Sequence, residues 1–142
     1  FISIAIISYF YEAHFRESTS ALLYFNWLGV ILGHNFPFYM GFKGGKGTAS
    51  MVGMMWGLNP VFGLGSMIVM AVVSIVSDYI AIGTAAMLAY GVVVTILFSD
   101  SYISFVIMIC LSAMSLYLHR KNFARIQRGE ESRVSKVLRI KK

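Results

Sequence analysis

The chain has 142 residues and a formal net charge of +6, with 58% hydrophobic and only 13% charged residues. Soluble globular domains carry about 25% charged residues, so this composition excludes an ordinary soluble domain and indicates a membrane protein. Between positions 18 and 118 the charged residues are Lys43, Lys46, Asp78 and Asp100, and each of them separates two apolar runs.

Six apolar segments follow one another along the chain, at residues 1–11, 20–33, 48–58, 61–77, 79–98 and 102–118. Lipid offers the backbone no hydrogen-bond partner, so membrane segments are helices or closed barrel strands. The length of these runs and their lack of alternation favour helices. The sequence therefore predicts an all-α, polytopic membrane protein with about six transmembrane or partly spanning helices in this chain.

Two of these segments are too short to cross a bilayer, which takes about 20 helical residues. Residues 1–11 start inside an apolar run, and we expect them to be the rest of a helix that begins upstream. Residues 48–58 reach only about 16 Å along a helix axis, so this segment must extend into its flanks or enter the membrane part-way. It ends at Asn59-Pro60, where Pro60 suits the first turn of the next helix. Cys110, the single cysteine, is expected to be a small apolar packing residue.

Basic residues concentrate at the C-terminal end, where nine of the twelve Lys and Arg lie in residues 119–142. A juxtamembrane segment this basic is typical of the cytoplasmic side and is attracted to anionic lipid headgroups. Because nothing in it resembles a nucleic-acid-binding module, no nucleic-acid partner is expected. The four segments between residues 48 and 118 return the chain to its starting side of the membrane. We therefore predict a transmembrane domain, 1–118, with a cytoplasmic glycine loop at 41–48, and a basic cytoplasmic segment, 119–142.

The stretch GHNFPFYMGFKGGKGTAS interrupts the apolar segments with glycines and two lysines. Gly44, Gly45 and Gly47 free the backbone to turn its N–H groups inward, while Lys43 and Lys46 add positive charge. A helix is predicted to start directly after them, so its positive dipole end faces the same point. These are the parts of an anion site, and a flexible basic loop is the alternative. The nucleotide P-loop pattern G-x-x-x-x-G-K-[ST] fails here, because glycine follows Lys46 where Ser or Thr is needed.

A second group of polar residues stands in HRKNFARIQRGEE, at the start of the basic segment. His119 and Asn122 are three residues apart and share a helix face, Arg125 continues this face, and Gly129 is suited to end the helix. The alternative is that these side chains only snorkel to the membrane surface. A shared site is favoured because this helix end and the glycine loop are predicted at the same membrane face.

Together, the two stretches resemble the second and third signature motifs of the bacterial acyl-phosphate:glycerol-3-phosphate acyltransferases. The matching patterns are G-H-x-F-P, F-K-G-G-K-G and H-R-x-N-x-x-R-x-x-x-G-E, and the resemblance covers essentially the whole chain. It implies a multi-pass protein of the bacterial cytoplasmic (inner) membrane, with about seven helices when complete and with its active site and C-terminus in the cytoplasm. The resemblance also places the family's first motif upstream of Phe1.

The activity that the resemblance implies is transfer of a fatty acyl group from acyl phosphate to the 1-hydroxyl of sn-glycerol 3-phosphate, which forms lysophosphatidic acid. It implies no metal, cofactor or coenzyme A. The expected partners are the two substrates and the lipid bilayer, and a monomer is the working expectation. Carried over to this sequence, Gly44, Gly45, Lys46 and Gly47 would hold glycerol 3-phosphate, with Lys46 on its phosphate and Lys43 as a further binding candidate.

The third motif implies roles for residues of the basic segment. His119 and Asn122 would bind and orient the substrates, and Glu130 would brace the tail. The donor's own phosphate would accept the hydroxyl proton, with His119 as general base as the alternative. Thr84 stands where the family usually has a serine, and His34 either shapes the end of a short helix or touches substrate. The predicted catalytic set is therefore His119, Asn122 and Lys46.

Other functional classes fit this sequence less well. An acyltransferase of the H-x-x-x-x-D class is excluded, because the residues at that spacing after the three histidines are Thr19, Tyr39 and Ala124. A membrane transporter of a small anion would place ionisable groups within the spans, and a catalytically inactive relative is a further alternative. Asp78 stands where family members commonly carry Arg, so we expect it to point away from the phosphates or to pair with a basic residue.

Overall fold

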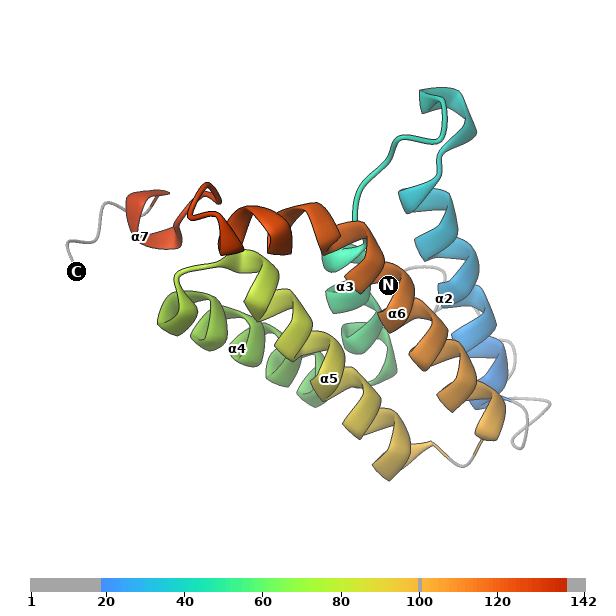
Figure 1. The fold of residues 1–142 in the computed structure, drawn as a ribbon. Coiled ribbons are helices and arrows are strands. Elements are labelled where there is room, and N and C mark those ends of the chain that lie inside the picture. Colours follow the sequence, from blue (N-terminus) through green and yellow to red (C-terminus); the bar gives the residue numbers. More distant parts are fainter. Residues whose placement is uncertain (1–18, 100, 138–142) are drawn as a thin grey trace.

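The computed structural model describes residues 19–99 and 101–137, and the regular elements of these residues are helices (Figure 1). The predicted all-α class is thus confirmed for this part of the chain, whereas the predicted segment 1–11 lies outside the described residues. The elements are α2 (Thr19–Asn35), the 3-10 helix η1 (Phe38–Met40), α3 (Thr48–Leu58), α4 (Pro60–Ser77), α5 (Ile80–Phe98), α6 (Tyr102–Gln127) and α7 (Val134–Val137).

Three of the described helices, α4, α5 and α6, are long and apolar enough to cross a membrane. The shorter α2 and α3 have 17 and 11 residues. The outward surface of α4 is strongly apolar, with Val61 and Val76 more than two-thirds exposed. Such a surface is costly in water and suits contact with lipid.

Local sequence signals account for the boundaries of α3 and α4. Gly47 precedes α3 with φ of 82°, and Asn59 follows it in an extended conformation. The side chain of Asn59 accepts a hydrogen bond of 2.8 Å from the Val61 N–H, which caps α4. Pro60 opens α4, as predicted, because its missing N–H needs no partner there.

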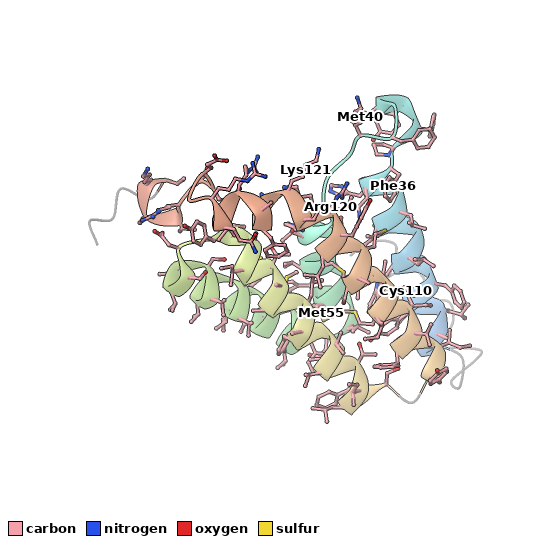
Figure 2. The ribbon with its side chains drawn as sticks, in the orientation of Figure 1. Phe36, Met40, Met55, Cys110, Arg120 and Lys121 are labelled. Atoms are coloured by element: carbon pink, nitrogen blue, oxygen red, sulfur yellow. The ribbon has the colours of Figure 1, made fainter. Side chains whose placement is uncertain are left out.

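The core lies where α2, α3, α5 and α6 meet, and methionine is its main residue type. Met55 and Met108 approach α5 at Gly91, where an added Cβ would collide with both methionine side chains. Figure 2 shows Met55 within the bundle and Cys110 on α6. Cys110 is exposed, so its predicted packing role is wrong: it lies on the side of α6 that faces away from these methionines.

One end of the bundle gathers segments that are far apart in the sequence. The connection between α2 and α3, residues 36–47, projects from this end, and we call it the glycine strap (Figure 1). The last turns of α6, together with α7, lie across the same end, next to the junction of α4 and α5. Side-chain contacts tie these segments together, among them Lys46 to Asn122 and Asp78 to Ser135.

Candidate functional site

The glycine strap is anchored to the end of α2 by its own backbone. The Gly44 N–H donates to the Asn35 carbonyl and the Gly45 N–H to the His34 carbonyl, both at 3.1 Å. The last carbonyls of a helix have no partner within it, so the strap completes the end of α2. These two N–H groups are therefore occupied, contrary to the expectation that they turn inward toward a ligand.

Gly44 and Gly45 are required by close approach. A Cβ at Gly44 would collide with the His34 carbonyl oxygen and lie 2.5 Å from Cδ of Pro37. A Cβ at Gly45 would collide with the His34 ring. The exposed His34 ring thus packs on the strap, which accounts for a histidine at the end of this helix.

The start of α3 presents backbone donors that no described side chain caps. Gly47 is the N-cap residue, and no side chain within residues 19–99 and 101–137 accepts a hydrogen bond from the first turn. The free N–H groups and the positive end of the helix dipole attract an anion at this point. Lys46 precedes Gly47 directly, so its ammonium charge is added beside the same helix end.

A chain of hydrogen bonds joins Lys46 to the end of α6. The Lys46 Nζ donates to the Asn122 Oδ1 at 2.5 Å, and the Asn122 Nδ2 donates to the Glu131 Oε1 at 2.8 Å. The Arg125 Nε donates to the other oxygen of Glu131 at 2.6 Å. Both ends of the Asn122 amide are thus occupied, which fixes its orientation and holds the Lys46 ammonium close to α6.

The structure places His119 one helical turn from Asn122, and its side chain is buried. Its Nδ1 lies 2.9 Å from the Ser115 carbonyl oxygen, which can only accept, so the Nδ1–H donates. The neutral imidazole then carries its lone pair on Nε2. The Ser115 hydroxyl donates to the Lys46 carbonyl at 3.2 Å, so the same turn of α6 holds both His119 and the strap.

The carboxylate that joins this cluster is Glu131, whereas bracing was predicted for Glu130. Glu130 is exposed, and its carboxylate approaches Arg128 only to 3.9 Å. Gly129 has φ of 72° and turns the chain back, so residue 131 is the one that returns to the face of Asn122. The hydrogen bond from Arg125 is the main reason that the pKa of Glu131 is below its ordinary value. Because the two glutamates are adjacent, the sequence does not show which of them contacts Asn122.

The other predicted site residues are not joined to this cluster by hydrogen bonds in the described part of the chain. Lys43 is exposed on the strap. Thr84 is buried, and its hydroxyl donates to the Ile80 carbonyl of its own helix at 3.0 Å. No group of three His, Cys, Asp or Glu within residues 19–99 and 101–137 could hold a metal ion.

Asp78 holds the C-terminal segment, a role that was not predicted from the sequence. Its Oδ1 accepts from the Ser135 N–H at 2.7 Å, and its Oδ2 accepts from the Ser135 hydroxyl at 2.8 Å. Its carbonyl also accepts from the Val134 N–H at 3.0 Å. These bonds direct the carboxylate to the start of α7.

This end of the bundle has the chemical groups of an anion site. An ammonium group, an uncapped helix start and an imidazole nitrogen lie on neighbouring turns, whereas no carboxylate other than Glu131, which is engaged by Asn122 and Arg125, is hydrogen-bonded to the cluster among the described residues. Such a site suits a phosphorylated ligand.

Comparison with known proteins gives one family. The family model for "Glycerol-3-phosphate acyltransferase" matches residues 1–129. A glycerol-3-phosphate acyltransferase of Thermoanaerobacter sp. (strain X514) is 29% identical over 80% of this chain and 58% of its own length. Glycerol-3-phosphate acyltransferase 1 of Oceanobacillus iheyensis is 36% identical over 81% of this chain and 55% of its own. The chain therefore spans about half the length of the curated relatives that it matches.

Two solved structures resemble the fold. Both are crystal structures of PlsY (YgiH), an integral membrane glycerol 3-phosphate acyltransferase. The glycerol 3-phosphate form has a TM-score of 0.72 and 25% identity, and the match covers 80% of this chain and 57% of the PlsY chain. The lysophosphatidic acid form has a TM-score of 0.69 and 27% identity, over 75% of this chain and 54% of its own.

Proposed function

This chain belongs to the glycerol-3-phosphate acyltransferase family, and from that premise we propose that the protein transfers a fatty acyl group from acyl phosphate to the 1-hydroxyl of sn-glycerol 3-phosphate, forming lysophosphatidic acid. The observation that carries the proposal is the contact between Lys46 and Asn122, which joins the two motif stretches beside the uncapped start of α3. The forms in which PlsY was crystallised support it, since they are named for the corresponding substrate and product.

Binding of glycerol 3-phosphate is assigned to the strap and α3. The Lys46 ammonium and the first N–H groups of α3 contact the phosphate, and Gly47 leaves room for it to approach the backbone. Gly44 and Gly45 shape the strap. Lys43 on the strap and His34 beside it are further candidates for substrate binding. Positive charge is needed here because two anionic substrates must be brought together against their mutual repulsion.

The reaction needs no nucleophile from the enzyme. The 1-hydroxyl of glycerol 3-phosphate attacks the acyl carbonyl, a new ester bond forms, and the bond from the carbonyl carbon to the phosphate oxygen breaks. The departing phosphate takes the hydroxyl proton, and the Nε2 of His119 is the alternative acceptor. His119 and Asn122 orient the substrates, and this positioning contributes to the rate enhancement. The reaction balances without a metal or a cofactor.

The protein is an integral, multi-pass membrane protein, and the curated relatives that it matches are bacterial. We place it in the bacterial cytoplasmic membrane with the strap and the basic segment in the cytoplasm, as a monomer with about six spanning or partly spanning helices. The charge asymmetry supports this orientation. A transporter of small anions is less well supported, because Lys46, Asn122 and Glu131 gather at one end of the bundle and not at its midplane.

The test is acyl transfer by the protein expressed from its natural reading frame in bacterial membranes. Labelled glycerol 3-phosphate is supplied with acyl phosphate or with acyl-CoA, and lysophosphatidic acid is measured. We expect product with acyl phosphate alone, and a loss of about 10- to 100-fold in kcat/KM for Lys46→Ala. Lys121→Ala is the matched control, because Lys121 is an exposed lysine of the same end of the bundle (Figure 2). Absence of product with either donor would refute the enzymatic proposal and favour the transporter or an inactive relative.

A further inference from the structure

Asn35 carries a buried amide group that no described residue satisfies. It is the last residue of α2 and only 2% exposed, yet neither its Nδ2 nor its Oδ1 has a hydrogen-bond partner within residues 19–99 and 101–137. Buried amides are nearly always paired, because an unpaired one loses its hydrogen bonds to water and gains none in the protein. Asn122, by contrast, uses both ends of its amide within the cluster. The amide of Asn35 is therefore available to form hydrogen bonds with a ligand.

The amide of Asn35 lies at the candidate phosphate site. A Cβ at Gly47 would stand 3.3 Å from both its Nδ2 and its Oδ1. Gly47 is the N-cap of α3, whose first turn no side chain caps. The Asn35 carbonyl also holds the Gly44 N–H, so the strap covers this end of α2. Two independent features, an uncapped helix start and an unpaired buried amide, thus meet at Gly47.

We propose that Asn35 is a substrate-binding residue that holds glycerol 3-phosphate, a role that rests on the proposed function. Its Nδ2–H donates to a phosphate or glycerol oxygen, and its Oδ1 accepts a hydrogen bond from a glycerol hydroxyl. A free donor and a free acceptor on one amide match a ligand that offers both kinds of group. Glycerol 3-phosphate does so, whereas the head group of acyl phosphate at neutral pH offers acceptors only. Asn35 therefore acts on the acceptor substrate and distinguishes it from the acyl donor.

A purely structural Asn35, paired with a buried water, makes opposite predictions. Replacing a water-paired amide by an apolar side chain of similar shape changes stability without touching substrate binding. Replacing a substrate-binding amide weakens the binding of one substrate and leaves the folded state intact. The isosteric variant Asn35→Leu separates the two cases, and Asn35→Asp, which keeps the size and adds negative charge, gives a second measurement should the first variant fail to fold.

The experiment uses the protein from its natural reading frame, purified in detergent. Equilibrium binding of labelled glycerol 3-phosphate, KM for each substrate and thermal unfolding are measured for the wild type and both variants. Ser104→Ala is the control, because Ser104 is also fully buried and its hydroxyl has no partner among the described residues. It lies in the first turn of α6, at the end opposite His119 and Asn122. For Asn35→Leu we expect the Kd and KM for glycerol 3-phosphate to rise about tenfold or more, with KM for acyl phosphate and Tm close to wild type. Asn35→Asp should bind glycerol 3-phosphate still more weakly, because its carboxylate repels phosphate.

Each outcome separates this inference from the proposed function. A wild type that binds glycerol 3-phosphate and turns it over, with both values unchanged in Asn35→Leu and Asn35→Asp, would overturn the role of Asn35 and leave the acyltransferase proposal standing. Equal losses for both substrates, or a fall in Tm with no change in Kd, would also overturn it and indicate a structural amide. A wild type that neither binds nor acylates glycerol 3-phosphate would overturn both.

Discussion

At the scale of single residues, Glu131 stands out because it connects stability to pH. Its hydrogen bond from Arg125 lowers its pKa in the folded protein. The stabilisation is therefore fully present above the pKa of the unfolded state and is lost as the pH falls through the lower pKa of the folded state. We expect the Tm of the wild type to fall in this acidic range, and Glu131→Gln to flatten that part of the curve.

Glu130→Gln is the matched control for this prediction, because the two residues are adjacent and Glu130 is exposed. Its Tm curve should follow that of the wild type. The measurement is thermal unfolding in detergent between about pH 3 and pH 7. An equal flattening by both variants would show that the acid sensitivity arises from general charge and not from the contact with Arg125.

At this scale, residues in the sequence motifs were predicted to share one site, whereas residues whose contacts depend on a turn or on burial were not predicted. Lys46, His119 and Asn122 were named as candidates, and the structure brings them onto neighbouring turns. Glu131 was missed because only the reversal at Gly129 decides which glutamate faces Asn122. Asn35 was missed because burial without a partner is a property of the packed molecule.

At the scale of elements, the glycine strap depends on close packing against α2. We expect Gly44→Ala to displace the strap, since the added methyl group would collide with the His34 carbonyl oxygen and crowd the Asn35 carbonyl, 2.8 Å away. Displacement of Lys46 and Gly47 should lower kcat/KM for glycerol 3-phosphate by roughly 10- to 100-fold. Steady-state kinetics with varied glycerol 3-phosphate measures this.

Gly41→Ala provides the comparison within the same strap. Gly41 has φ of 60°, but an added Cβ would meet nothing within 4 Å. The change should cost about 1 kcal/mol of backbone strain and leave the kinetics within about twofold of wild type. A larger kinetic loss for Gly41→Ala than for Gly44→Ala would show that backbone conformation, and not close approach, governs the strap.

The junction between α4 and α5 holds α7 through Asp78, and this makes a second prediction at the scale of elements. Asp78 has φ of 68°, a conformation that glycine adopts without strain. Asp78→Gly relieves that strain and removes both side-chain bonds to Ser135, so we expect faster tryptic cleavage at Arg133 and Lys136. Asp78→Asn should protect the segment almost as well as the wild type, because its amide can still pair with the Ser135 N–H and hydroxyl. Equal cleavage of all three proteins would show that Asp78 does not hold this segment.

The boundaries of the helices were predictable where the sequence marks both ends. The predicted segment 48–58 coincides with α3, because Gly47 and the Asn59-Pro60 pair flank it. The apolar run 102–118 ends nine residues before α6 does, since a helix that leaves the membrane becomes polar without ending. The 3-10 helix η1 within the strap was not predicted, because short turns carry little periodicity.

At the scale of the whole molecule, the sequence allowed the site to be placed at one end before its contacts were known. An even number of crossings between the strap and the basic segment requires both to lie on one side. The contact between Lys46 and Asn122 agrees with this parity, since it joins residues that are 76 positions apart in the sequence. The number of crossings does not determine how far each helix enters the membrane. Helix α3, with 11 residues, is too short to cross the membrane alone.

The orientation in the membrane gives the last prediction. A helix of 26 residues such as α6 is about 39 Å long, and the hydrocarbon core is about 30 Å thick, so the two ends of α6 should reach opposite aqueous faces. In a Cys110→Ala background, which removes the single cysteine, we introduce Tyr102→Cys at the start of α6 or Ser132→Cys beyond its end. Both positions are exposed.

Intact bacterial cells, with the outer membrane made permeable, are then treated with a thiol reagent that cannot cross the inner membrane. We expect labelling at position 102 and none at position 132 until the cells are broken, because the basic segment is held in the cytoplasm by its positive charge. Labelling at position 132 alone would invert the orientation and place the candidate site outside the cell, away from cytoplasmic substrates. Labelling of both positions in intact cells would contradict a membrane-spanning α6. Only the expected pattern puts Lys46, His119 and Asn122 on the side where phosphorylated metabolites are found.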